Sequence, residues 1–177
     1  YTHAHYDDEA FNEDRNELLE QLQDNGIETV VNIGASIDTS KNTIELTKKY
    51  KHVYGAIGVH PSDTAELTEE SFAWLKEQIG LPKIVAIGEI GLDYYWDTPE
   101  RELQKRWFKK QLYLAIDSQM PVVIHSRDAA EDTLTIMKEA KQYAKEQGKE
   151  FTGVIHCFSY GVEMAREYVK MGFYLGI

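Results

Sequence analysis

Two histidines near the start of the chain, His3 and His5, have a spacing that suits metal ligands. They lie in the tetrapeptide Thr2-His3-Ala4-His5. On a β-strand, residues i and i+2 point to the same face, so both imidazoles would project to one side and could share a metal ion. Pairs of this kind also occur by chance on solvated strand faces. The pattern therefore gains its weight from the residues that recur farther along the chain.

Three more histidines and one glutamate follow later apolar runs that we predict to be strands. They are His60, Glu89, His125 and His156. A lone histidine after a strand is more often structural, and a glutamate between two glycines is more often solvated. In a parallel barrel, however, the carboxyl ends of all strands open onto one mouth, so these side chains would share a cavity. Imidazole and carboxylate ligands together suit Zn²⁺, Mn²⁺ or a similar ion, which favours a metal-dependent hydrolase.

Short apolar runs alternate with amphipathic helices along the whole chain. We predict a strand at the first histidine pair and six later strands, at 29–33, 53–57, 84–87, 122–124, 153–155 and 173–177. The helices are expected at 14–24, 39–50, 69–79, 98–118, 128–147 and 162–171. The strands are continuously apolar, which is typical of a parallel sheet buried on both faces.

Two α/β architectures fit this alternation, an open doubly wound sheet and a closed barrel. No G-x-G-x-x-G or Walker sequence is present, which disfavours an open nucleotide-binding sheet. Reactive residues after several strands favour the (βα)8 TIM-type barrel. Such a barrel typically needs about 250 residues, and this chain has 177. We therefore expect a single catalytic barrel domain over residues 1–177, C-terminally truncated, with strand eight missing and little activity on its own.

The composition narrows the class of protein further. Hydrophobic residues make up 42% of the chain, and no apolar run approaches the roughly 20 residues of a membrane span. The net charge of −11 disfavours a protein that coats nucleic acid, but not an enzyme that meets it at one metal-loaded pocket. The single cysteine, Cys157, fits a reducing compartment, so we expect a cytoplasmic protein with no obligate protein partner.

Five segments occur in an order that is recognisable. They are T-H-A-H at 2–5, G-V-H-P at 58–61, G-E-I-G-L-D-Y-Y at 88–95, I-H-S-R-D-A at 124–129 and H-C-F-S at 156–159. Together they closely resemble the TatD family of metal-dependent deoxyribonucleases, within the amidohydrolase-like barrels. The resemblance implies two divalent metal ions (Mg, Mn or Zn) and a DNA substrate that is single-stranded or has frayed ends, cut in an exonuclease-like manner.

The same resemblance assigns roles to individual residues. It implies that His3 and His5 hold one metal, that His125 and His156 hold the second, and that Glu89 bridges them. His60 and Arg127 would contact the substrate phosphate, for which the planar guanidinium fork is well suited. Asp93 would either orient a metal ligand or cap its own loop.

The chain departs from the family pattern at three places. Tyr1 stands where the family usually has Asp, and Tyr160-Gly161 follows H-C-F-S where the family usually has Gly. The family's last metal ligand, an Asp after strand eight, is expected beyond Ile177.

Two other functions and one local question stay open from the sequence. The metals could serve hydrolysis of an amide, lactone or aminoacyl ester, or the barrel could be a non-catalytic interaction module. Tyr94, Tyr95 and Trp96, just after Glu89, could stack on bases or pack against helices.

Overall fold

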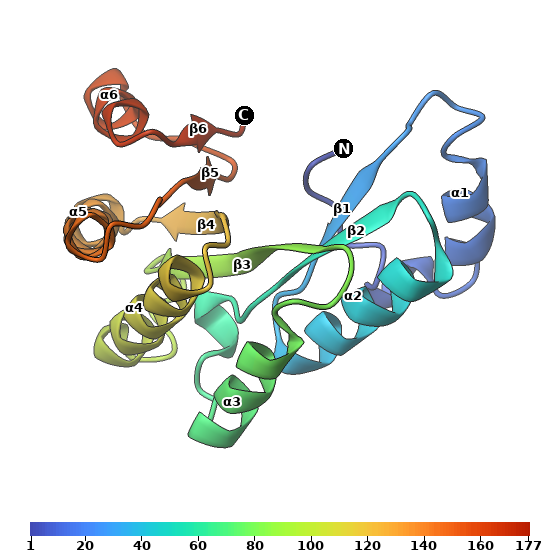
Figure 1. Ribbon diagram of the computed structural model, residues 1–177, viewed down its shortest axis with the longest axis horizontal. Coiled ribbons are helices and arrows are strands. Elements are labelled where there is room, and N and C mark those ends of the chain that lie inside the picture. Colours follow the sequence, from blue (N-terminus) through green and yellow to red (C-terminus); the bar gives the residue numbers. More distant parts are fainter.

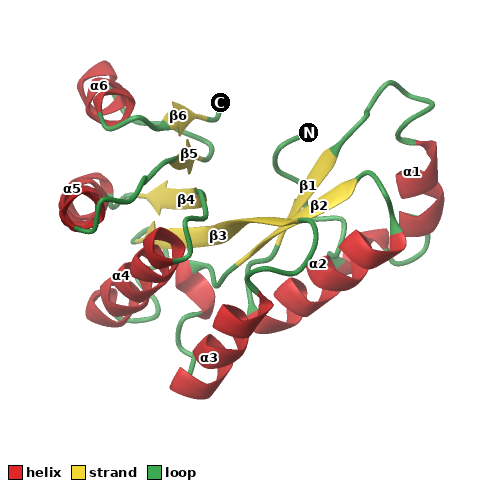
Figure 2. Cartoon of the chain, viewed as in Figure 1, coloured by secondary structure: helices red, strands yellow, loops and turns green.

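The protein, described by a computed structural model of residues 1–177, is built on one parallel sheet of six strands in chain order (Figures 1 and 2). Because every neighbouring pair of strands is parallel, the connections must cross over, and each of them does so through a helix. The strands are β1 (Val30–Ile33), β2 (Val53–Ile57), β3 (Ile84–Asp93), β4 (Val122–Arg127), β5 (Gly153–Ile155) and β6 (Tyr174–Leu175). The helices are α1 (Arg15–Gln21), α2 (Ile37–Lys49), α3 (Glu69–Gln78), α4 (Arg101–Asp117), α5 (Ala130–Glu146) and α6 (Val162–Lys170), with short 3-10 helices η1 (Glu9–Phe11) and η2 (Pro61–Asp63).

The sheet is curved and its helices lie along the convex side, so that the chain forms part of a barrel wall (Figure 1). The expected α/β class with a parallel, barrel-type sheet is confirmed. None of the helices is long and apolar enough to cross a membrane.

The prediction of a strand at residues 2–5 is wrong, because this segment forms only an isolated parallel bridge between Ala4 and Asn32. The ladder beside β1 stops there for a local reason. The Ile33 carbonyl that would continue it lies 2.9 Å from Nδ1 of His5, and the Tyr6 N–H donates to the Asn32 side chain at 2.7 Å. The sheet therefore has six strands rather than the seven predicted.

Strand β3 is longer than its predicted range of 84–87, because it continues through an irregularity. Its pairing with β4 shifts register between Ile87 and Ile90, and both isoleucines are buried among the helices of the outer core. Strict alternation from Ile87 would also turn Glu89 outward. The extra residue instead sends Glu89 to the concave face. Glu89 and, likewise, His125 in β4 thus lie within strands, not after them as predicted.

Apolar residues pack on both faces of the sheet. A large cluster fills the space between the sheet and its helices. On the concave face, Ile33, Ala56, Ala86 and Val123 form a small layer contributed by four adjacent strands. Glu89 follows Ala86 in β3 and His125 follows Val123 in β4, so this layer is the apolar floor of the candidate site.

The helix ends are fixed by local hydrogen bonds. Ser36 caps α2 and Thr68 caps α3, each in a reciprocal pair with the residue three positions on. Helix α4 begins at Arg101, not at the predicted 98, because Gln104 Nε2 holds the Pro99 carbonyl at 2.8 Å ahead of the helix.

Candidate metal centre

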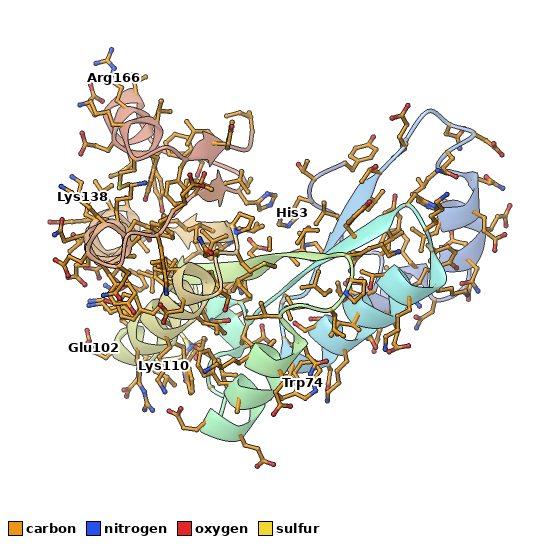
Figure 3. All side chains as sticks on the ribbon, viewed as in Figure 1. His3, Trp74, Glu102, Lys110, Lys138 and Arg166 are labelled. Atoms are coloured by element: carbon orange, nitrogen blue, oxygen red, sulfur yellow. The ribbon has the colours of Figure 1, made fainter.

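Three of the predicted ligands surround the carboxylate of Glu89 on the concave face. Nε2 of His3 lies 3.4 Å and Nε2 of His5 lies 4.0 Å from Oε2 of Glu89, and the two imidazole nitrogens are 3.0 Å apart. The other oxygen, Oε1, lies 3.1 Å from Nδ1 of His125. Figure 3 shows His3 on this inner side, between the two arms of the curved sheet. Oε2 of this carboxylate therefore faces His3 and His5, and Oε1 faces His125.

The segment that carries His3 and His5 is held by a buried asparagine. Asn32 is fully buried in β1, and its Oδ1 accepts the Tyr6 N–H at 2.7 Å. Its Nδ2 donates to Oδ1 of Asp7 at 2.7 Å and to Oγ1 of Thr43 at 2.8 Å. The Arg15 guanidinium then donates to the carbonyls of Tyr6, Asp7 and Asp8. Sequence reasoning missed this network, whose one signal was a lone asparagine inside the apolar run of β1.

A second cluster lies beside the first and shares His125. Nε2 of His125 lies 2.9 Å from Oδ2 of Asp93, and the His60 ring meets the His125 ring edge to face at 4.3 Å between centroids. Ligand atoms of His60, Asp93 and His125 all lie within 4.8 Å of one another. Asp93 also accepts the Tyr95 N–H through Oδ1 at 3.0 Å. Asp93 thus contacts both His125 and its own loop, and its role toward a metal ligand stays a prediction.

His156 reaches the same region without joining either cluster. Its ring stacks on that of His3, with centroids 3.4 Å apart. It lines a cavity of about 410 Å³ together with His60, Glu89, His125 and Arg127. The pairing of His125 with His156 on one metal stays a prediction.

The charges in the cluster are set by burial and by mutual contact. Burial alone would raise the pKa of Glu89, but hydrogen bonds and charge from His125 and His3 outweigh it and hold that pKa well below its ordinary value. Burial would lower the pKa of His125, but the carboxylates of Glu89 and Asp93 raise it overall. Burial, together with the nearby charge of His125, lowers the pKa of His60 to about 4. Burial also lowers the pKa of His156, with His3 contributing. Glu89 is thus a carboxylate and His60 is neutral near pH 7.

The loop that carries His156 is tied to the neighbouring strand by Tyr160, one of the departures from the family pattern. The Tyr160 hydroxyl lies 2.9 Å from Oγ of Ser126 and accepts the Ala129 N–H at 3.3 Å. It thereby joins the end of β4 to the turn after β5. Through these two contacts Tyr160 anchors the loop that carries His156 to the end of β4.

The donor set fits divalent cations. Imidazole nitrogens and carboxylate oxygens converge from four segments of the chain, which carry His3 and His5, His60, Glu89 and Asp93, and His125. Nitrogen and carboxylate donors together are the ligand set that suits Zn²⁺, Mn²⁺ and similar ions.

Known proteins resemble this chain over nearly all of its length. The profile of the family described as TatD related DNase matches residues 2–177. The uncharacterized metal-dependent hydrolase YabD of Bacillus subtilis is 41% identical over 174 residues, covering 98% of this chain and 66% of the relative. The 3'-5' ssDNA/RNA exonuclease TatD of Cronobacter sakazakii is 32% identical over 167 residues, covering 94% and 61%. The chain thus spans about two thirds of the length of these relatives.

Two solved structures have the same fold. The TatD homologue YJJV of Escherichia coli superposes with a TM-score of 0.88 at 27% identity, over 99% of this chain and 66% of that one. A TatD family hydrolase of Entamoeba histolytica gives a TM-score of 0.77 at 28% identity, over 93% and 56%.

Proposed function

Because the chain belongs to the TatD related DNase family, we propose that the protein is a metal-dependent hydrolase that cleaves phosphodiester bonds of DNA from a strand end. The observation that carries the proposal is the placement of His3 and His5 at one oxygen of Glu89 and of His125 at the other, beside a cavity lined by Arg127 and His60. The name of one relative, a 3'-5' ssDNA/RNA exonuclease, supports a nucleic-acid substrate.

In this proposal two divalent ions (Mg, Mn or Zn) occupy the cluster. His3 and His5 would hold one, His125 and His156 the other, and Glu89 both. Such ions supply a hydroxide at neutral pH and neutralise the charge that develops on the leaving oxygen. The depressed pKa of Glu89 supports its role, because only the ionised carboxylate has lone pairs on both oxygens free for ligands.

The remaining residues would bind and orient the phosphate. Arg127 lies at the end of β4 and lines the cavity, where its guanidinium can take two phosphate oxygens. A neutral His60 can donate one N–H without repelling the metals. Asp93 would fix the ring orientation of His125 by accepting from Nε2. We also propose a cytoplasmic location, which rests on the single free cysteine.

The test is cleavage of a 5'-labelled single-stranded DNA by the full-length protein with Mg²⁺, Mn²⁺ or Zn²⁺. We expect a ladder of shortened products that disappears with EDTA and falls at least about 100-fold in Glu89→Gln, with bound metal reduced in parallel. The control is Glu163→Gln, which removes an exposed carboxylate from α6 and should cleave normally. Metal-loaded protein that leaves DNA intact but hydrolyses amides or lactones would instead establish the alternative amidohydrolase.

A further inference from the structure

Two aromatic side chains stand exposed beside the metal cluster, in the loop that follows β3. Tyr95 is 53% exposed and Trp96 is 66% exposed. Their rings meet edge to face with centroids 4.9 Å apart. The guanidinium of Arg127 covers the Tyr95 ring at 3.7 Å. Trp96 is also the tryptophan most open to solvent, since Trp107 is buried and Trp74 is partly buried.

The loop that presents them is firmly held at its base. Oδ1 of Asp93 accepts the Tyr95 N–H, while Gln104 brackets the Asp93 backbone by donating to its carbonyl at 3.0 Å and accepting from its N–H at 2.9 Å. The preceding residue, Tyr94, is buried and donates its hydroxyl to Asp132 at 2.7 Å. Tyr94 therefore packs in the protein interior, which is one of the two roles that the sequence left open for these aromatic residues. Tyr95 and Trp96 instead face solvent from a loop whose base is held by hydrogen bonds.

The loop is joined to the cluster through two side chains. Asp93 touches both His125 and the Tyr95 backbone with its two oxygens. Arg127 lines the cavity with Glu89 and also lies on the Tyr95 ring. A phosphate held by Arg127 would therefore have its own or the adjacent nucleotide at the two aromatic rings.

We propose that Tyr95 and Trp96 form a stacking platform for an unpaired nucleobase next to the phosphate that is cut. The inference rests on the proposed function and deepens it, because it names the state of the substrate strand. Only a base that has left its partner offers a free π-face, and stacking of this kind accepts any base. Cation–π contact with Arg127 holds the Tyr95 ring in place and adds to the attraction for the nucleotide.

The experiment compares two substrates and two substitutions at one position in the full-length, metal-loaded protein. The substrates are 5'-labelled thymidine oligonucleotides and oligonucleotides of the same length whose terminal units lack bases. We expect kcat/KM to favour the base-bearing substrate about 5- to 100-fold, the range for loss of one stacked base. Trp96→Leu keeps apolar bulk but has no ring, so the preference should collapse toward one, mainly through KM. Trp96→Phe should keep most of the preference.

A second readout does not depend on turnover. Thymidine oligonucleotides should quench tryptophan fluorescence of the wild-type protein in EDTA, and this quenching should vanish in Trp96→Phe and with abasic strands. An undiminished preference in Trp96→Leu, with quenching that persists in Trp96→Phe, would overturn the platform and leave the nuclease standing. Absence of cleavage from every variant, with quenching specific to Trp96, would instead overturn the proposed activity and keep the base-binding platform.

Discussion

Asn32 shows how one buried amide can position two prospective metal ligands that it does not touch. It takes the Tyr6 N–H that a continuing ladder would have used, and it reaches Asp7 on one side and Thr43 of α2 on the other. These bonds fix the chain directly after His5, and the backbone bonds of Ala4 with Val31 and Ile33 hold it between the two imidazoles.

Asn32→Ala should therefore destabilise the fold by about 2–3 kcal/mol, because it leaves a buried carboxylate and a backbone N–H without partners. Urea unfolding measures the loss directly. The matched control is Asn42→Ala, an exposed asparagine of α2, which should change stability by less than about 0.5 kcal/mol. Equal stability of the two variants would mean that the N-terminal segment is held by other contacts.

At the scale of elements, helices α4 and α5 are joined to the end of β3 by a small charged contact. Lys105 of α4 lies 2.8 Å from Oδ2 of Asp132 on α5, and the Tyr94 hydroxyl donates to the same oxygen at 2.7 Å. Lys105 first, and then Tyr94, lower the pKa of Asp132. A carboxyl group whose pKa is lower in the folded state stabilises the fold above its unfolded pKa of about 3.9, and this contribution is lost as the pH falls through the folded value.

Asp132→Asn should therefore cost stability at pH 7 and progressively less below pH 4. Because Asp132 is partly exposed, we expect a loss below about 1 kcal/mol. Urea unfolding at several pH values gives the difference. Glu131→Gln removes the same charge from the same turn without a partner, and it should show no such pH dependence. A loss that stayed constant down to pH 3 would contradict an electrostatic origin.

The close pairing of β3 with β4 demands a glycine at position 91. Gly91 has a φ of +153°, and a Cβ atom there would lie 1.8 Å from the carbonyl oxygen of His125. Gly91→Ala should push the two strands apart and cost more than about 3 kcal/mol, with disruption of the His125 contacts. Thermal unfolding checks this against Gly161→Ala, where φ is ordinary and the nearest atom is 3.7 Å away. Similar unfolding temperatures for the two variants would contradict the close approach.

Most of these elements could be predicted, and the exceptions have common causes. Apolar runs and helical periodicity located the strands and helices after residue 28 because burial on both faces leaves a strong signal. The predicted strand around His3 does not form, because the side chains of His5 and Asn32 contact the backbone groups that would continue the ladder. The predicted end of β3 was too early, because the glycines on either side of Glu89 are typical of a loop. The convergence of His3, His5, Glu89 and His125 was predictable from strand order, whereas the contact of Asp93 with His125 depends on how far β3 extends and could not be predicted.

At the scale of the molecule, the net charge of −11 limits how many phosphates of a DNA substrate the protein surface can bind. Long phosphate tracks repel such a surface, and each neutralised phosphate of a single strand adds about −0.7 to the slope of log affinity against log salt. Under the proposed function, the phosphate contacts concentrate at Arg127 and the metal cluster.

The dependence of log kcat/KM on log KCl should therefore be shallow, with a slope of about −1 to −2. Arg127→Ala should flatten the slope by about 0.7, while Lys51→Ala, an exposed lysine in the turn before β2, should leave it unchanged. A slope steeper than about −4 would require a long basic groove and would contradict this view of substrate binding.

Because β3 is irregular, the candidate site depends on the number of residues in this strand as well as on their chemistry. In a regular strand, residues an odd number apart face opposite sides, yet Ile87 and Ile90 share the outer core. Deleting Gly88 would restore the ordinary parity and keep the Glu89 carboxylate on the concave face, but it would move that carboxylate by about 3.3 Å along the strand relative to its three histidines, although every reactive side chain would still be encoded. The number of residues between the two isoleucines is thus as much a part of the site as the glutamate that lies between them.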